Sequence, residues 1–581
     1  MYSNEECMKE IRELLDNYED GLNIFKKDPP GDWMAPLARK EGSTADNIPE
    51  TWMGLAEAVI GIIAKKKYDL DTYPNVMKLI SAEYMIDAYT NVGMPKNYTH
   101  WSFGLDHARN EAQYRKGQMG LAYEIVINTN PCEVYNMDTN SRLMMLLVTA
   151  HAGFGHNTFF KNNHLFTEHT DAEEINPLLE RLKRFVKECE EKYGIQEVED
   201  VLSACHALES HAVNRYSRPR AKSPKEIREQ IEERRKFLEQ NYDHLLEVTT
   251  RKAASASDDF KEASEVDIRI ERDENLLRFI ADYSPKYHNA NEVASRRGKP
   301  GEPWQTQLMR MIADKSQYFY PQIQTKVMNE GCASFWHYRL LGDMYDMDLI
   351  DDGMYMEFIT SHSGVLTQRD FDSKYYSGFN PYKLGFEIFM DIERVCNNPT
   401  DEDKEWFGKA QWFQDVQAGK ADWLSVMKDI VVEYRDETFV SQFLSPKVIR
   451  EMSLFVVHDD EMDDEMVVTA IHNRAGYEKV RDALADHYNL ANRTPQIEVV
   501  DYDYSRNRAL YLEHTVHRGR ELDDDINNVL QQVWYLWSAD KKGSISPVIL
   551  NSVDSETGEQ IQSYALPKRE EGKQPGRKRQ P

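Results

Sequence analysis

The sequence predicts a mainly helical protein, in which a large helical core domain is followed by a small α+β domain. Apolar residues recur at three- and four-residue spacing in Met77–Tyr89 and Thr139–His151, which is typical of helices with one buried face. Near Met452 the pattern changes to short β-rich runs that alternate with two helical segments. The expected strands are Leu454–Val457, Met466–Ile471, Ile497–Val500 and Ala509–Glu513, and the expected helices are Gly476–Tyr488 and Leu522–Trp537. A hydrophobic fraction of 41% in 581 residues provides enough apolar material for several packed domains.

Four consecutive segments follow from this pattern. Residues 1–66 form a polar, helical N-terminal extension, and residues 67–450 form the helical core. Within the core, residues 217–262 are charge-dense, which predicts an exposed helix followed by a flexible stretch. Residues 451–560 form the small α+β domain, and residues 561–581, rich in Lys, Arg, Glu, Gly and Pro, are a disordered tail.

The charge balance argues against whole classes of partner. Acidic residues exceed basic ones by 99 to 71, and a formal charge of −28 disfavours nucleic acid and anionic membrane surfaces. The apolar stretch Trp52–Ala64 is too short for a membrane span of roughly 20 residues. The N-terminus lacks the pattern of a secretory signal, and six scattered cysteines suit a reducing compartment. We therefore expect a soluble, cytoplasmic protein.

Two histidines at the end of an apolar helix could bind one metal ion. His151 and His156 are five residues apart, which places them about 140° apart around an ideal α-helix. A π-type turn would bring both onto one side, and Gly153 and Gly155 make that distortion inexpensive. The alternative is a helix C-terminus capped by Gly155, with a histidine placed on the helix dipole.

A second segment contains Glu330 and His337. They are seven residues apart and share one helical face, but roughly 10 Å separates them, so only one would bind a given ion directly. The other would line a substrate pocket, support the ligands or bind a second ion. The sequence Asn-Glu-Gly-Cys-Ala around Glu330 has the form in which many zinc peptidases present a glutamate ligand. The alternative is a pair of buried polar partners.

Other candidates are less specific. His206 could be a further metal ligand, although a lone helical histidine is more often a satisfied core residue. Glu124 could be a catalytic base or could simply line the edge of a pocket, and it lies in Gly120–Ile127, which is expected to be a lone strand followed by a turn. Three side chains could donate hydrogen bonds to an oxyanion or be core residues, namely Tyr318, Tyr320 and His362.

Longer stretches carry a resemblance to a known family. They are, in order, Asp71-Thr-Tyr-Pro74, Gly93-Met-Pro95, His100-Trp-Ser-Phe-Gly104, Gly120-Leu-Ala-Tyr-Glu-Ile-Val-Ile-Asn128, Gly155-His156-Asn157, Phe159-Phe-Lys-Asn-Asn163, Ser316-Gln-Tyr-Phe-Tyr-Pro-Gln322, Met328-Asn-Glu-Gly331, Tyr376-Ser-Gly378, Asn380-Pro-Tyr382 and Ser441-Gln-Phe-Leu-Ser-Pro-Lys447. From Tyr68 to about residue 515, the chain resembles the stage V sporulation protein R family.

The resemblance implies a link to spore cortex formation or, in bacteria that do not sporulate, to stress physiology. It also implies a serine protein kinase and a von Willebrand A-like protein as partners. The family's histidine and Asn-Glu-Gly segments are similar to the zinc sites of gluzincin peptidases, which implies a gluzincin-like core. On that similarity His151, His156 and Glu330 are the best zinc ligands, with His206 and His337 as further ligands or supporting residues.

One departure from the peptidase pattern affects the catalytic base. The His-Glu-x-x-His motif places a glutamate after the first histidine, whereas this chain has Ala152 there. Glu124 is the carboxylate that we expect to take over this role, with His337 as a second catalytic candidate.

Two functions of different classes follow from these observations. The first is a zinc-dependent hydrolase acting on a peptide bond, such as one related to the cell wall, in which three protein ligands leave one position for water. The second is a non-catalytic regulatory or assembly protein that acts with the kinase and the von Willebrand A-like partner. A redox-active iron site is a third possibility, because sets of histidine and carboxylate ligands also suit iron.

Overall fold

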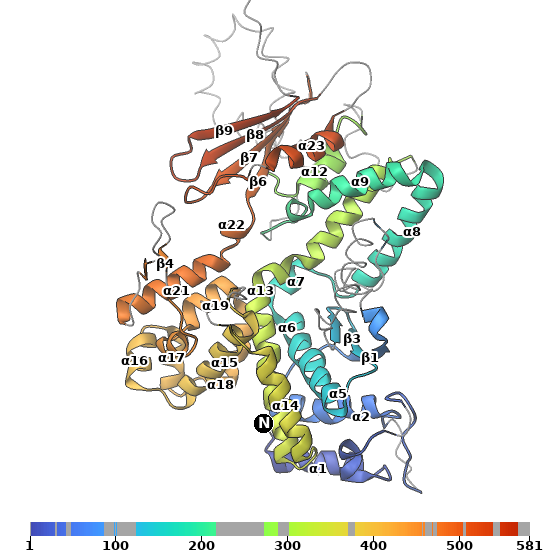
Figure 1. Cartoon of the computed structure of the whole chain (residues 1–581), viewed down its shortest axis with the longest axis vertical. Helices are drawn as coiled ribbons and strands as arrows, with labels where there is room; N and C mark the ends of the chain where they lie inside the picture. Colours follow the sequence, from blue (N-terminus) through green and yellow to red (C-terminus); the bar gives the residue numbers. More distant parts are fainter. Residues whose placement is uncertain are drawn as a thin grey trace, which may run out of the picture. The chain divides into compact units, whose positions relative to one another are not determined.

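The protein is described here by a computed structural model (Figure 1). The described residues are 2–29, 32–41, 48–85, 98, 100, 124–216, 272–288, 301–369, 373, 378–455, 457–458, 467–468, 473–502, 507–523, 525–538 and 546–567. The expected exposed helix of residues 217–262 lies outside this set, as does the expected tail from residue 568 onward.

The chain forms two compact units, each built from two separate stretches. Unit 1 comprises Met1–Glu188 and Tyr318–Arg493, and unit 2 comprises Cys189–Gln317 and Thr494–Pro581. The structure thus groups the chain differently from the four consecutive segments suggested by the sequence. The expected mainly helical class is confirmed for the described residues. Within them, no helix combines the length and the apolar character that crossing a bilayer requires.

Unit 1 is a helical body with a small three-stranded sheet and a separate two-stranded one. Its elements before residue 189 are α1 Asn4–Leu15, η1 Gly21–Lys26, α2 Trp52–Ile62, η2 Ile63–Lys67, β1 Asn75–Ile80, β2 Glu124–Ile127, β3 Cys132–Met137, α5 Arg142–Val148, η3 Thr149–His156, α6 Asn157–Asn162, α7 His164–His169 and the beginning of α8 Ile175–Tyr193. Its later elements are most of α13 Trp304–Asp346, then α14 Asp352–Val365, α15 Pro381–Asn397, α16 Asp401–Phe407, α17 Gln411–Gln417, α18 Trp423–Glu433, α19 Asp436–Phe443, α20 Pro446–Glu451, β4 Val457–His458, β5 Val467–Val468, α21 Arg474–Tyr488 and α22 Leu490–Arg493.

The small sheet corrects one expectation and extends another. Residues 77–80 were expected to begin a helix, but they belong to β1, which runs parallel to β3. The strand expected up to Ile127 is confirmed as β2, yet it is not alone, because the sheet has the order β1-β3-β2 with β2 antiparallel to β3. The π-helix η3 packs against β2 and β3, so this sheet places the start of β2 beside η3.

Helix α13 is held in its interior by a carboxylate from another helix. Asp436, at the start of α19, is fully buried and accepts hydrogen bonds from the backbone N–H groups of Val327 (3.0 Å) and Met328 (2.9 Å). These groups lie less than two turns after Pro321, which interrupts the regular hydrogen bonding of the helix. Burial raises the pKa of Asp436 to about 7, although the backbone donors oppose that shift.

The Asp436→Ala substitution should lower the free energy of unfolding by about 2 kcal/mol, because it removes the acceptor of two buried N–H groups. Asp429→Ala in the neighbouring α18 is the control, since an exposed side chain should change stability by no more than about 0.5 kcal/mol. Denaturant titration of both variants at pH 8 makes the comparison. Equal losses in the two variants would show that Asp436 does not stabilise α13.

Unit 2 contains a four-stranded sheet with helices beside it (Figure 1). Its elements are the end of α8, then α9 Ile195–Ala207, η4 Glu209–His211, α12 Leu276–Tyr283, the first turns of α13, β6 Gln496–Tyr502, β7 Leu510–Val516, α23 Ile526–Trp537, β8 Val548–Asp554 and β9 Gln560–Leu566. The order is β6-β7-β8-β9, with β7 and β8 parallel and the outer pairs antiparallel. The sequence indicated β6, β7 and α23 but not β8 or β9, and β9 occupies the first residues of the expected tail.

Candidate metal centre

Three elements of unit 1 bring two histidines and two glutamates together. The π-helix η3 carries His151 and His156, the first residue of β2 is Glu124, and the middle of α13 carries Glu330. Both histidines are about 95% buried, and both carboxylates are largely buried. Segments separated by up to 206 residues in sequence therefore meet at one polar site inside a helical body.

The expected π-type turn is confirmed, and it explains how His151 and His156 share one side. In a π-helix five residues make roughly one turn, so residues i and i+5 project in similar directions. Their rings are 4.6 Å apart between centroids. Gly155 allows η3 to approach α13 closely, since a Cβ there would lie 2.5 Å from the Cα of Ala333. Every residue of η3 is buried, so packing compensates for the unusual helix.

The donor atoms have the spacing of a ligand set. Nε2 of His151 lies 3.4 Å from Oε1 of Glu124 and 3.8 Å from Oε2 of Glu330, while Nε2 of His156 lies 3.4 Å from that same Oε2. One donor atom each of Glu124, His151 and His156 lies within 4.8 Å of the other two. A tetrahedral ion with bonds of about 2.0–2.2 Å needs donors about 3.3–3.6 Å apart. The two separations of 3.4 Å fit that requirement, and the separation of 3.8 Å is slightly longer than it.

One buried oxygen of each carboxylate also lacks a hydrogen-bond donor among the described residues. Among the described residues, no hydrogen-bond donor reaches Oε2 of Glu124 or Oε2 of Glu330, although both atoms are buried. Two neighbouring buried carboxylates are costly unless a cation or a proton lies between them. The neutral imidazole and carboxylate donors suit Zn²⁺ and also Fe²⁺.

Each histidine is supported on the side away from the glutamates. Nδ1 of His156 donates to Oδ1 of Asn329 at 2.9 Å, so its Nε2 lone pair points towards Glu330. Nδ1 of His151 lies 2.8 Å from Nδ1 of His337. Both imidazoles are therefore oriented by second partners, as in known metal sites.

The pKa values of the two carboxyl groups are shifted in opposite directions. Burial raises the pKa of Glu124 to about 7, and the repulsion of Glu330 adds to this effect while His151 opposes it. Burial would also raise the pKa of Glu330, but His156, His151 and a hydrogen bond with Tyr382 together lower it. Glu330 is thus the permanent anion of the pair, and Glu124 is the carboxyl that exchanges a proton near neutral pH.

The pKa values of the two histidines are also shifted in opposite directions. Burial lowers the pKa of His156 to about 4, which keeps its imidazole neutral and able to bind an ion. Burial would lower the pKa of His151 as well, but the attraction of Glu124 and Glu330 outweighs it and the net shift is upward.

The remaining candidates are not among the four residues of the donor group. His337 contacts His151 through Nδ1, and its Nε2 lies 2.7 Å from Nδ1 of His362. The hydroxyl of Tyr318 donates to the backbone carbonyl of Asn128 (2.8 Å), and Tyr320 accepts from Gln324 (2.9 Å). His206 belongs to unit 2, where its Nε2 lies 3.9 Å from Oε1 of Glu209. The donor group described above is therefore formed without it.

The comparisons with known proteins agree with one another. The family model described as "SpoVR like protein" matches residues 52–493, and that described as "SpoVR-like C-terminal domain" matches residues 495–541. The chain belongs to the SpoVR family. An uncharacterized protein of Escherichia coli strain K12, YcgB, is 42% identical over 478 residues, which cover 82% of this chain and 88% of that protein. No solved structure matches.

The SpoVR match spans all four donor residues and two supporting residues that sequence reasoning missed. Asn329 and Tyr382 orient His156 and Glu330, and both lie in stretches on which the family resemblance was recognised, Met328-Asn-Glu-Gly331 and Asn380-Pro-Tyr382. The motifs were visible, but nothing local indicates that the two side chains face one site.

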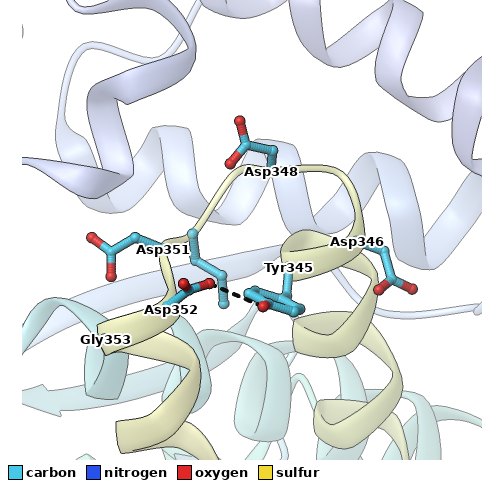
Figure 2. A pocket seen from close by; sticks show the side chains of 7 residues that line it. Tyr345, Asp346, Asp348, Asp351, Asp352 and Gly353 are labelled. Atoms are coloured by element: carbon cyan, nitrogen blue, oxygen red, sulfur yellow. Dashed lines mark hydrogen bonds between the residues drawn. The ribbon is translucent and has the colours of Figure 1, made fainter.

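A hollow of about 640 Å³ lies away from this centre, at the turn between α13 and α14 (Figure 2). Three of its four acidic side chains already have structural roles. Asp348 pairs with Lys26 (2.6 Å), Asp351 caps α14, and Asp352 accepts a hydrogen bond from the Tyr345 hydroxyl (3.0 Å). We assign no function to this hollow.

Proposed function

We propose that Glu124, His151, His156 and Glu330 form a metal centre and that the protein is a metal-dependent hydrolase of peptide or related amide bonds. The observation that carries the proposal is the spacing of the donor atoms: one donor atom each of Glu124, His151 and His156 lies within 4.8 Å of the other two, and Oε2 of Glu330 lies 3.8 and 3.4 Å from Nε2 of the two histidines. The buried oxygens of the two glutamates, which no donor reaches among the described residues, support it further.

The residues take different roles. His151, His156 and Glu330 hold the ion, because their donors converge and the two imidazoles are oriented by partners behind them. A bound Zn²⁺ would polarise the scissile carbonyl and make water more acidic at neutral pH. Glu124 acts as the general base, because its carboxylate comes from β2 and faces both histidines. It replaces the glutamate that the His-Glu-x-x-His motif would place at Ala152.

The proposed likeness to gluzincin peptidases is one of ligand chemistry. Two histidines from one helix and a glutamate from another helix form the set in both cases. This chain differs in using a π-helix and a carboxylate from a strand. Because the chain belongs to the SpoVR family, we expect the substrate to be connected with spore cortex formation or stress physiology. Elemental analysis would show whether the bound metal is zinc or iron.

One observation favours a second candidate, a non-catalytic regulatory protein. A donor atom of Glu124 lies within 4.8 Å of a donor atom on each histidine, so Glu124 could be a fourth ligand. Four protein ligands would close the site, as in structural zinc centres. Such a centre would organise the fold around η3 and α13. The protein would then act through partners, for which the family resemblance suggests a serine protein kinase and a von Willebrand A-like protein.

The Glu124→Gln substitution separates the two candidates. For the hydrolase, zinc-loaded protein should cleave members of a peptide library, and Glu124→Gln should retain about one equivalent of zinc while losing at least about 100-fold in rate. Glu168→Gln, an exposed change in α7, is the matched control and should leave both quantities unchanged. Loss of zinc in Glu124→Gln, together with an inactive parent protein, would instead favour the closed centre.

A further inference from the structure

Three buried imidazoles form a continuous row that begins at the candidate metal centre. Nδ1 of His151 lies 2.8 Å from Nδ1 of His337, and Nε2 of His337 lies 2.7 Å from Nδ1 of His362. The three rings come from η3, α13 and α14, and none is more than 6% exposed. Both distances are those of hydrogen bonds.

The row can be satisfied only if its protons all point the same way. A neutral imidazole has one N–H donor and one lone pair, so each ring that accepts at one nitrogen must donate at the other. An ion bound at Nε2 of His151 occupies that lone pair and leaves the proton on Nδ1. His337 then accepts at Nδ1 and donates from Nε2, and His362 accepts at Nδ1.

The opposite direction is incompatible with metal binding. If His337 donated from Nδ1, His151 would carry its proton on Nε2, which faces Glu124 and Glu330, and it would have no lone pair for an ion.

Three aromatic rings surround His362 at the end of the row. Tyr338 stacks on its ring at 5.1 Å between centroids, and Phe386 and Phe358 lie 4.8 and 5.7 Å away. Aromatic walls around a pair of buried imidazoles provide few other polar partners. The hydrogen bond with His337 therefore helps to fix the orientation of His362 among these rings.

We propose that His337 and His362 are positioning residues that hold His151 in the tautomer able to bind a metal ion through Nε2. This inference rests on the proposed metal centre. It gives His337 a role behind the ligand rather than at the reacting bond. It also makes His362, on a separate helix, part of the machinery of the centre.

A pair of substitutions at His337 tests the inference. Asparagine places its side-chain oxygen near the former Nδ1 and can still accept from His151, whereas glutamine places its amide near the former Nε2 and cannot. Zinc affinity, measured by competition with a chromophoric chelator, should stay within about threefold of the parent in His337→Asn. It should fall about 10- to 100-fold in His337→Gln, the usual effect of losing such a partner.

A second pair extends the test along the row. His362→Asn retains an acceptor for the N–H of His337, whereas His362→Phe removes it and should weaken zinc binding by a smaller factor, at least about threefold. Thermal unfolding of each metal-free variant checks whether packing alone has changed. The inference requires that zinc affinity depend on whether the variant side chain keeps the hydrogen-bond acceptor, and not on the stability of the metal-free protein.

The outcomes are distinguishable. A parent that binds zinc while both His337 variants bind it equally well, or equally poorly, overturns the tautomer inference and leaves the metal centre in place. Affinity that falls in step with metal-free stability across all four variants also overturns it. A parent that binds no zinc overturns the proposed centre and the inference with it.

Discussion

Alanine at Gly331 or Gly385 should destabilise the protein by about 3 kcal/mol or more. A Cβ at Gly331 would lie 2.4 Å from the Cα of Gly385, and a Cβ at Gly385 would lie 2.1 Å from the carbonyl oxygen of Val327. These neighbours are backbone atoms, which cannot move aside as a flexible side chain does. Helices α13 and α15 would have to separate, so the cost lies at or above the upper end of ordinary overpacking.

The separation would also affect the site, because Gly331 directly follows Glu330. We expect the two variants to lose metal as well as stability, since Glu330 would move away from the histidines of η3. Denaturant unfolding and bound-metal analysis measure the two effects on the same samples.

Gly342→Ala is the matched control in the same helix. Apart from its chain neighbours and the nearby backbone of its own helix, no atom of the described residues lies within 4 Å of its would-be Cβ, so alanine should stabilise the protein by about 0.5–1 kcal/mol through its better helix propensity. If Gly331→Ala and Gly385→Ala were as well tolerated as Gly342→Ala, the close contact between α13 and α15 would be wrong.

The second prediction concerns pH and the metal-free protein. The pKa of Glu124 is raised from the ordinary 4.5 to about 7, so the folded state binds more protons than the unfolded state across this window. The stability contributed by Glu124 is therefore complete below pH 4.5 and is lost as the pH rises through 7. A shift of about 2.5 pKa units corresponds to roughly 3 kcal/mol at 1.36 kcal/mol per unit.

The measurement compares the parent with Glu124→Gln, because other groups titrate over the same range. The pKa of Asp436 is raised like that of Glu124, so its contribution to stability also falls as the pH rises. The lowered pKa of His156 has the opposite effect and makes stability rise with pH. In the presence of a chelator, the parent-minus-variant difference in unfolding free energy should fall by roughly 3 kcal/mol between pH 4 and pH 8. A difference that is flat or that rises with pH would contradict the environment assigned to Glu124.

The sequence indicated much of the site because its geometry is mostly local. The five-residue spacing of His151 and His156 beside two glycines implied a π-type turn, and helix geometry separated Glu330 from His337. Both follow from periodicity along one element. The structure places His337 behind His151 rather than at the other donors, which is one of the arrangements that this separation allowed.

What the sequence did not provide depends on contacts between distant segments. Residues 77–80 have helical spacing but pair with β3, more than 50 residues away, so tertiary pairing overrides the local pattern. The hydrogen bond between Asn329 and His156 forms where two helices cross, and so does the close contact between Gly331 and Gly385. No local sequence pattern encodes these crossings. The row from His151 to His362 requires three elements to meet, which only the structure reveals.

The most direct test of the metal centre is the metal content of the purified protein, measured by elemental analysis after reconstitution with zinc. His156→Ala and Glu330→Ala, checked for folding by circular dichroism, accompany the parent, and exposed Glu168→Gln is the control. Our account predicts close to one equivalent of zinc in the parent and the control, and less than about a tenth of that in the two ligand variants. A folded parent that holds no stoichiometric metal would contradict it.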